Sequence, residues 1–210
     1  DLHSFPTRRS SDLVQPVNNT VGNWATEERF YSRLAEHKTI WGGLTAAAWQ
    51  YIGRQGVLGG TYELLRAALE KHFREPAAPH RWVLTAGLGG MGSSQPISAR
   101  MLELSTLVVE ADPAKLAKLR AAGGIDLVID DLDGALATIS AAITERRPVA
   151  VGLLGNAADV FPAVVASGAR PDVVTDQTAA HDARYGYLPS GYTLNRSEER
   201  RVGKECRSRW

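Results

Sequence analysis

A glycine-rich turn between a short apolar run and a helix start constrains this chain more than any other feature. The run Trp82–Thr85 (WVLT) is apolar and partly β-branched, which predicts a buried strand. Residues 87–92 (GLGGMG) fit the pattern G-x-G-x-x-G, and Ser93 and Pro96 follow where a helix would begin. Glycines let the backbone approach a pyrophosphate closely, and the N–H groups of a helix N-terminus can hold that anion. Strand, turn and helix start together predict a dinucleotide-binding site.

A carboxylate follows at the spacing that ribose recognition needs. The apolar run Thr106–Val109 predicts a second strand, and Glu110 ends it. This acid lies roughly 20 residues past the turn, where a carboxylate can accept hydrogen bonds from the ribose hydroxyls of NAD. The alternative is a structural glycine turn beside an ordinary charged strand end. The combination of strand, turn, helix start and acid favours the cofactor site.

The pattern after Glu110 alternates between helices and strands. We expect helices at Pro113–Ala121, Leu132–Thr144 and Asp159–Ala166, the last with Pro162 in its first turn, and strands at Ile125–Ile129, Val149–Leu154 and Asp172–Thr175. This alternation predicts an α/β fold with a doubly wound, Rossmann-like parallel sheet. Ligands of such sheets bind outside the carboxyl ends of the strands. We therefore expect the polar loops 87–92, 155–158 and 176–181 to converge there.

A helical and loop-rich segment precedes the sheet. Residues 27–36 and 61–73 have helical apolar spacing, and Thr61 is placed to cap the second helix. Residues 41–60 are dense in Gly, Ala and aromatic residues without a clean period. They predict either a tightly packed connector or one wall of a ligand site, and composition favours the connector. We assign residues 14–79 to this segment and residues 80–195 to the dinucleotide-binding domain.

The two ends of the chain are expected not to belong to the fold. Residues 1–13 and 196–210 lack an apolar period and are rich in Arg and Ser. Codons exist for residues 196–210 whose reverse complement, in one frame, translates as residues 1–13. That DNA resembles a sequencing-library adapter. We therefore expect both ends to be artefactual flanks without defined structure, and the segment between them to be an internal fragment of a longer protein.

Composition bounds the partners once these flanks are set aside. The whole chain has a formal net charge of +1, but the segment between the flanks has slightly more acidic than basic residues, so nothing favours a nucleic-acid partner. The single cysteine, Cys206, lies in a flank, which leaves no disulfide framework or thiolate metal site. No apolar run is long enough to cross a membrane. We expect a cytoplasmic protein with a small-molecule substrate.

No metal site is expected. His37, His72 and His80 lack the spacing of metal ligands, and the acids Asp130, Asp131 and Asp133 precede a helix, where carboxylates stabilise the helix dipole.

Four motifs resemble one enzyme family, the urocanases or urocanate hydratases. In order they are AGLGGMGSSQP, LLGNAADVFP, RPDVVTDQTAAHD and GYLPSGYT, and the resemblance covers about residues 24–193. It implies a tightly bound NAD⁺ that acts as an electrophile while water adds to urocanate, giving imidazolone propionate in histidine degradation. It also implies a homodimer for the intact protein. The family is longer than this segment, so we expect the fragment alone to be inactive.

The resemblance also implies cofactor-binding residues. They are the pyrophosphate turn Gly90, Met91 and Gly92, the ribose acid Glu110, Lys115, the turn Asn156 and Ala157, the loop Gln177, Thr178, Ala179, Ala180 and His181, and finally Tyr187 and Leu188. His181 is also the candidate for proton transfer, because histidine titrates near neutral pH. The alternative is a histidine that contacts cofactor or caps its loop. The family's active-site cysteine falls in a portion absent from this sequence.

Three departures from the family pattern leave other functions open. Ser93 and Ser94 stand where the family has Gly and Ala, Gly43 stands where it has a cofactor-contacting glutamine, and Lys115 replaces an arginine and so loses bidentate geometry. The alternatives to a hydratase are an NAD-dependent dehydrogenase and a non-catalytic NAD-binding homologue.

Overall fold

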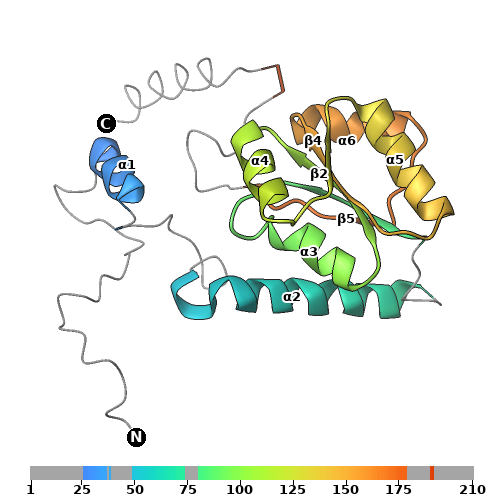
Figure 1. Cartoon of the computed structure of the whole chain (residues 1–210), viewed down its shortest axis with the longest axis horizontal. Helices are drawn as coiled ribbons and strands as arrows, with labels where there is room; N and C mark the ends of the chain where they lie inside the picture. Colours follow the sequence, from blue (N-terminus) through green and yellow to red (C-terminus); the bar gives the residue numbers. More distant parts are fainter. Residues whose placement is uncertain (1–25, 37, 39–48, 74–79, 179–189, 192–210) are drawn as a thin grey trace, which may run out of the picture. The chain divides into compact units, whose positions relative to one another are not determined.

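The computed structural model describes residues 26–36, 38, 49–73, 80–178 and 190–191. The chain divides between Tyr51 and Ile52 into two compact units, which we describe separately. The second unit holds the sheet on which the candidate site is built (Figure 1).

In the first unit, α1 (Glu27–Ala35) forms where the sequence predicts a helix at residues 27–36. Beyond its last turn, the carboxylate of Glu36 lies 2.6 Å from the ammonium group of Lys38 and 2.8 Å from the guanidinium of Arg33. Hydrogen bonds from these two cations lower the pKa of Glu36 below its ordinary value, and the bond from Lys38 has the larger effect.

In the second unit, the described residues form one sheet of five parallel strands in the order β3-β4-β2-β1-β5 (Figure 1). The strands are β1 (Trp82–Ala86), β2 (Ser105–Glu110), β3 (Leu127–Ile129), β4 (Ala150–Leu154) and β5 (Val173–Val174). Each overlaps the apolar run that predicted it. Every residue of β1 and β2 is buried, as expected of the central strands of a parallel sheet covered on both faces. The predicted α/β class is confirmed.

Helices cover both faces of this sheet. One face carries α2 (Trp49–His72), α3 (Ser94–Met101) and α4 (Pro113–Ala121), and the other carries α5 (Leu132–Thr144) and α6 (Ala157–Ala166). Alternate strand residues point to opposite faces, so Val83 packs against α2 and α3 while Leu84 packs in the cluster that includes α5 and α6. Figure 1 shows α2 and α3 on the side of the sheet away from α5 and α6.

The connections out of β2 and β4 leave toward opposite faces. Strand β2 leads into α4 on one face, whereas its hydrogen-bonded neighbour β4 leads into α6 on the other. Two neighbouring strands whose connections diverge leave a crevice at their carboxyl ends. The strand order therefore places a ligand crevice beside Glu110 and Leu154, which pair at the end of these strands.

The expected cap and connector before the sheet are wrong. Helix α2 begins at Trp49 and runs through the positions assigned to a connector, while residues 41–48 lie outside the described residues. Thr61 is therefore inside the helix, where its hydroxyl donates to the carbonyl of Val57 at 2.8 Å. Gly59 and Gly60 weaken the local helix signal. Packing against α3 compensates, since the hydroxyl of Ser98 donates to the carbonyl of Leu58 at 3.0 Å.

Helix α6 begins two residues earlier than its pattern predicts. The side chain of Asn156 caps it by accepting a hydrogen bond from the N–H of Ala158 at 3.0 Å. Pro162 consequently lies inside the helix rather than in its first turn, which corrects the expectation. The early start brings the helix N-terminus to the carboxyl end of β4.

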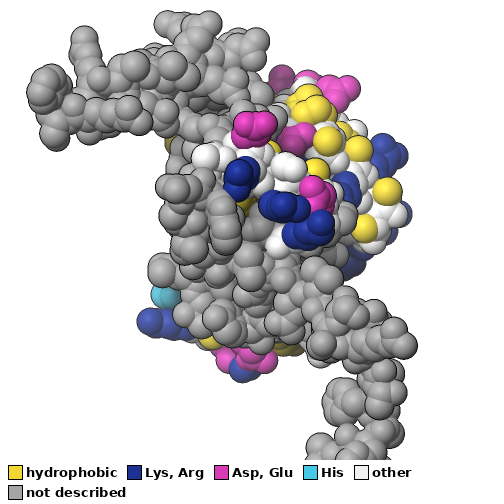
Figure 2. Space-filling view, turned by 90° about the vertical axis from the view of Figure 1, so that its left-hand side faces the viewer, with side chains coloured by type: hydrophobic (Ala, Val, Ile, Leu, Met, Phe, Trp, Pro, Cys, Tyr) yellow, Lys and Arg dark blue, Asp and Glu magenta, His cyan; other side chains and the backbone are white. Residues whose placement is uncertain are grey.

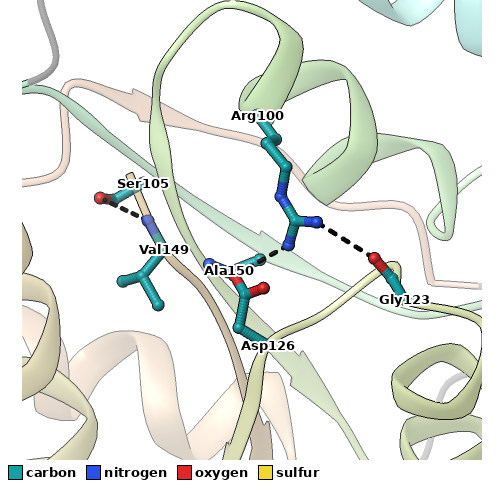
Figure 3. Close-up of polar contacts among 6 residues, drawn as sticks. All are labelled: Arg100, Ser105, Gly123, Asp126, Val149 and Ala150. Carbon is teal, nitrogen blue, oxygen red and sulfur yellow. Dashed lines mark hydrogen bonds and ion pairs between the residues drawn. The ribbon is translucent and has the colours of Figure 1, made fainter. Parts of the chain in front are cut away.

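A hydrogen-bonded clasp joins the amino ends of the strands (Figure 3). One oxygen of Asp126 accepts from the N–H of Ala150 and from the guanidinium of Arg100, both at 2.8 Å. Arg100 also donates to the carbonyl of Gly123 at 3.1 Å. This set, the Asp126 clasp, ties the end of α3 to the starts of β3 and β4.

Charges of both signs are interspersed on the described surface. Figure 2 shows basic and acidic side chains beside one another, with apolar ones between them. On α2, Arg66 pairs with Glu63 at 3.0 Å and also with Glu70. These carboxylates raise the pKa of Arg66 above its ordinary value, and the hydrogen bond with Glu63 is the largest cause. Exposed pairs of this kind add little stability. None of the helices in the described ranges combines the length and apolar character that crossing a membrane requires.

Candidate functional site

A cavity of about 380 Å³ opens at the carboxyl ends of four strands. Its walls come from residues 86–89 at the end of β1, residues 109–111 at the end of β2, residues 155–158 after β4, and Asp176 and Thr178 after β5. Parts of the three loops expected to converge therefore line one cavity. Its volume lies in the range of small-molecule sites, about 300–1,000 Å³.

The glycine turn requires glycine at two positions. Gly87 has φ +84°, and a Cβ atom there would lie 2.6 Å from the carbonyl oxygen of Gln177. A Cβ atom at Gly92 would lie 1.9 Å from the carbonyl oxygen of Gly87. Neither contact is possible in a folded protein, so both positions exclude any side chain. The turn is thus closed on itself and packed against the segment after β5.

The crest of this turn presents free hydrogen-bond donors. Within the described part of the chain, the N–H groups of residues 89–92 donate to no acceptor. Neither of the serines that follow is recorded as an acceptor for them: the hydroxyl of Ser93 donates to the carbonyl of Gly90 at 3.3 Å, and that of Ser94 donates to the carbonyl of Met91 at 2.6 Å. Ser93 occupies the N-cap position of α3 but makes no side-chain cap hydrogen bond. Free backbone donors at a turn that leads into a helix are suited to an anion.

Glu110 braces the turn from the neighbouring strand. Its side chain is buried, one carboxylate oxygen accepts from the N–H of Leu88 at 2.6 Å, and the other accepts from that of Asp112 at 3.0 Å. Each carboxylate oxygen has a second lone pair, so these bonds leave acceptor capacity toward the cavity. The residue chosen from the sequence for ribose recognition therefore also holds the glycine turn.

Another part of the lining combines a helix N-terminus with a cation. Asn156, the N-cap of α6, and Ala157, its first residue, line the cavity, and Lys115 lines it from the first turn of α4. The positive end of a helix dipole and a lysine both favour negative charge. Ser190, from the motif GYLPSGYT, donates to Asp159 in the first turn of α6.

The predicted cofactor residues fall into three groups. Glu110, Lys115, Asn156, Ala157 and Thr178 line the cavity. Gly90, Met91, Gly92 and Gln177 do not line it but belong to the adjoining turn and segment. Ala179, Ala180, His181, Tyr187 and Leu188 lie outside the described residues, as does Gly43.

The sequence pattern did not indicate Phe161 and Pro162 as lining residues. They line the cavity from the second turn of α6. The early start of the helix would have revealed them, because they lie four residues past Ala157 and Ala158 and so return to the same face of the helix. No group of three or more potential metal ligands occurs in the described ranges.

One comparison identifies the relatives of this chain. The family model described as the urocanase Rossmann-like domain matches residues 53–207, more than half of the chain. The match includes all five strands and every described residue that lines the cavity. It ends inside the segment expected to be an artefactual flank, so the boundary of that flank stays a prediction. The chain belongs to the urocanase family, and its sheet lies within that family's Rossmann-like domain.

Proposed function

We propose that this domain binds NAD⁺ in the cavity, as the cofactor-binding portion of a urocanate hydratase. The observation that carries the proposal is a row of N–H donors at residues 89–92 that have no acceptor among the described residues, beside a cavity of about 380 Å³. Within a urocanase-family domain, the ligand that suits an anion cradle next to a buried carboxylate is a dinucleotide.

The residues present fit several parts of such a cofactor. The turn at Gly90–Gly92 offers donors to the pyrophosphate, and Glu110 offers acceptor capacity to the adenosine ribose. Lys115 and the N-terminus of α6 supply positive potential in another part of the lining. Phe161 and Pro162 supply apolar surface, which small-molecule sites need for most of their area. Gln177 and the residues 179–181, 187 and 188 complete the proposed set.

In the proposed reaction, NAD⁺ supplies an electrophile to the imidazole ring of urocanate, with no net hydride transfer. The role of this chain is to hold the cofactor and orient it toward the substrate. Proton transfer is assigned to His181 and to groups beyond this segment. We infer that residues 14–79 and 80–195 represent two parts of a longer, homodimeric, cytoplasmic protein, and that the segment alone lacks turnover.

The cofactor proposal is tested by titrating the purified 210-residue chain with NAD⁺ in a calorimeter. The parent chain is expected to bind, and Gly90→Val to lose more than about 100-fold in affinity, because a side chain there obstructs the pyrophosphate. The matched control is Gly60→Val, since Gly60 is an exposed glycine of α2 with nothing within 4 Å of a Cβ atom. An affinity unchanged by Gly90→Val, with the circular dichroism of the parent, would remove the turn from the site.

The reaction is tested with the natural gene product that contains residues 14–195. Loss of the urocanate absorbance band without NADH formation supports the hydratase. Formation of NADH supports the alternative dehydrogenase, and bound NAD⁺ without turnover supports a non-catalytic homologue. The same assay on the 210-residue chain is expected to show no turnover, and turnover there would refute the fragment proposal.

A further inference from the structure

A polar cluster of two buried side chains and one partly buried side chain lies next to the glycine turn, and none of the three lines the cavity. Its members are Thr85 of β1, Gln95 of α3 and Thr175, the residue after β5. Thr85 and Gln95 are 0% and 2% exposed. Buried polar side chains of this kind are costly unless each finds a partner, so their arrangement restricts the backbone that carries them.

The hydroxyl of Thr175 joins the other two side chains. It donates to the hydroxyl of Thr85 at 2.7 Å and to Oε1 of Gln95 at 3.2 Å. Thr175 has a single hydroxyl hydrogen, so the two acceptors share it. One side chain therefore links β1, the segment after β5 and α3.

The backbone beyond Thr175 continues alongside β1 up to the turn. The N–H of Thr175 donates to the carbonyl of Leu84 at 2.9 Å, and that of Gln177 donates to the carbonyl of Ala86 at 2.8 Å. Gln177 then packs against Gly87 so closely that no Cβ atom fits between them. The close contact between Gln177 and Gly87 therefore fixes the position of the segment 176–178 relative to the glycine turn.

Asp176 shapes the next step of this segment. Its carboxylate accepts from the N–H of Thr178 at 2.8 Å and from the Thr178 hydroxyl at 2.6 Å. Asp176 and Thr178 both line the cavity, whereas none of Thr85, Gln95 and Thr175 does. The cluster is thus joined through the backbone to residues that line the cavity, but its own side chains do not line it.

We propose that Gln95 and Thr175 are positioning residues for the NAD⁺ site. Their hydrogen bond holds the wall formed by residues 176–178 in register with the glycine turn, so that the turn's donors and this wall face one ligand. The inference rests on the proposed function, and it adds a pair of residues that act on the cofactor without touching it. Thr175 sets the position of the wall, and Gln95 connects that position to the start of α3.

The test compares NAD⁺ affinity with stability in isosteric variants. Thr175→Val removes the hydroxyl while keeping the shape and is expected to weaken NAD⁺ binding about tenfold, a free-energy change that one hydrogen bond can carry. Thr175→Ser keeps the hydroxyl and is expected to restore affinity to within about threefold of the parent. Hydrogen exchange at the amide of Gln177 should accelerate in Thr175→Val and not in Thr175→Ser, because the wall loosens locally.

The matched control is Thr106→Val on β2. Thr106 is fully buried, whereas Thr175 is partly buried, and the hydroxyl of Thr106 has no hydrogen-bond partner among the described residues. The same substitution there removes a buried hydroxyl without breaking a bond, so NAD⁺ affinity should stay at the parent value. A loss of affinity in this control as large as in Thr175→Val would assign the effect to general loosening of the sheet and overturn the proposal.

Gln95→Met keeps the argument testable should Thr175→Val fail to fold. It breaks the same hydrogen bond from the other side and is expected to cause a similar loss of NAD⁺ affinity. Either variant that keeps parental affinity while unfolding at a lower temperature refutes the positioning role. Failure of the parent chain to bind NAD⁺ refutes the proposed function instead, so the two failures are distinguished by the first titration.

Discussion

The two ends of the same parallel sheet treat their polar groups in opposite ways. At the amino ends of the strands, Arg100 and Asp126 form the clasp, and Arg81 pairs with Asp172 at 2.8 Å, which leaves Nε of Arg81 as a single buried donor without a partner among the described residues. At the carboxyl ends, the turn at residues 89–92 presents four consecutive N–H groups without acceptors in the described part of the chain. A folded chain seldom leaves donors unsatisfied, so a row of unused backbone donors beside a cavity indicates a place for a ligand.

Cavity volume does not make this distinction. The cavity at the amino end, between Arg100 and Glu145, measures about 580 Å³ and exceeds the one at the carboxyl end, about 380 Å³. In the larger cavity Arg100 is paired with Asp126, and the exposed Arg147 is paired with Glu145 at 3.1 Å. The comparison teaches that polar groups left for a ligand, rather than empty space, mark the functional end of this sheet.

Gly92→Ala should break the comparison most strongly. The new Cβ atom would lie 1.9 Å from the carbonyl oxygen of Gly87, so the turn must open. We expect a loss of about 2–4 kcal/mol in the free energy of unfolding, together with loss of NAD⁺ binding. Urea unfolding and calorimetry measure the two effects. Gly60→Ala is the control of opposite sign, since alanine in an exposed helix interior should add about 1 kcal/mol. Parental stability of Gly92→Ala would contradict the closed turn.

Glu110→Gln should also lower stability and NAD⁺ binding at the carboxyl end of the sheet, but by less than Gly92→Ala does. The carboxylate accepts from the N–H groups of Leu88 and Asp112, whereas an amide has one acceptor and would turn its own N–H₂ toward one of these donors. We expect about 1–3 kcal/mol less stability, weaker NAD⁺ binding and reduced discrimination against NADP⁺. Competition of the two nucleotides for the parent and the variant measures the last effect. Equal affinities of the parent chain for both would exclude Glu110 as the ribose acid.

Asp126→Ala should sharpen the comparison, because it damages only the other end. The variant loses the acceptor for the N–H of Ala150 and for Arg100. We expect about 1 kcal/mol less stability, since the site is partly exposed and water replaces part of the loss, while the Kd for NAD⁺ changes less than about twofold. Glu145→Ala, which removes an exposed ion pair, should leave stability within about 0.5 kcal/mol. A larger affinity loss in Asp126→Ala would show that the two ends are coupled.

Local signals explain why so many elements were predictable. The bounds of α4 and α5 agree with the expected ranges because Asp112 and Asp131 cap them and Pro113 opens the first. The strands β1 and β2 were recognisable from their continuous apolar character, which burial on both faces requires. The start of α2 was not predictable, because its local propensity is lowered by Gly59 and Gly60 and tertiary packing overrides that deficit.

The sequence by itself determined the nature of the site: a glycine turn after a buried strand, an acid about 20 residues later and a βα alternation. Periodicity, capping and spacing are local properties, and they are readable along the chain. Only the tertiary structure decided that β4 lies between β2 and β3, that Glu110 accepts hydrogen bonds from two backbone N–H groups, and that Thr175 donates a hydrogen bond to Gln95. These contacts bring together residues far apart in sequence, and hydrogen bonds of that kind depend on how the sheet is ordered rather than on any local pattern.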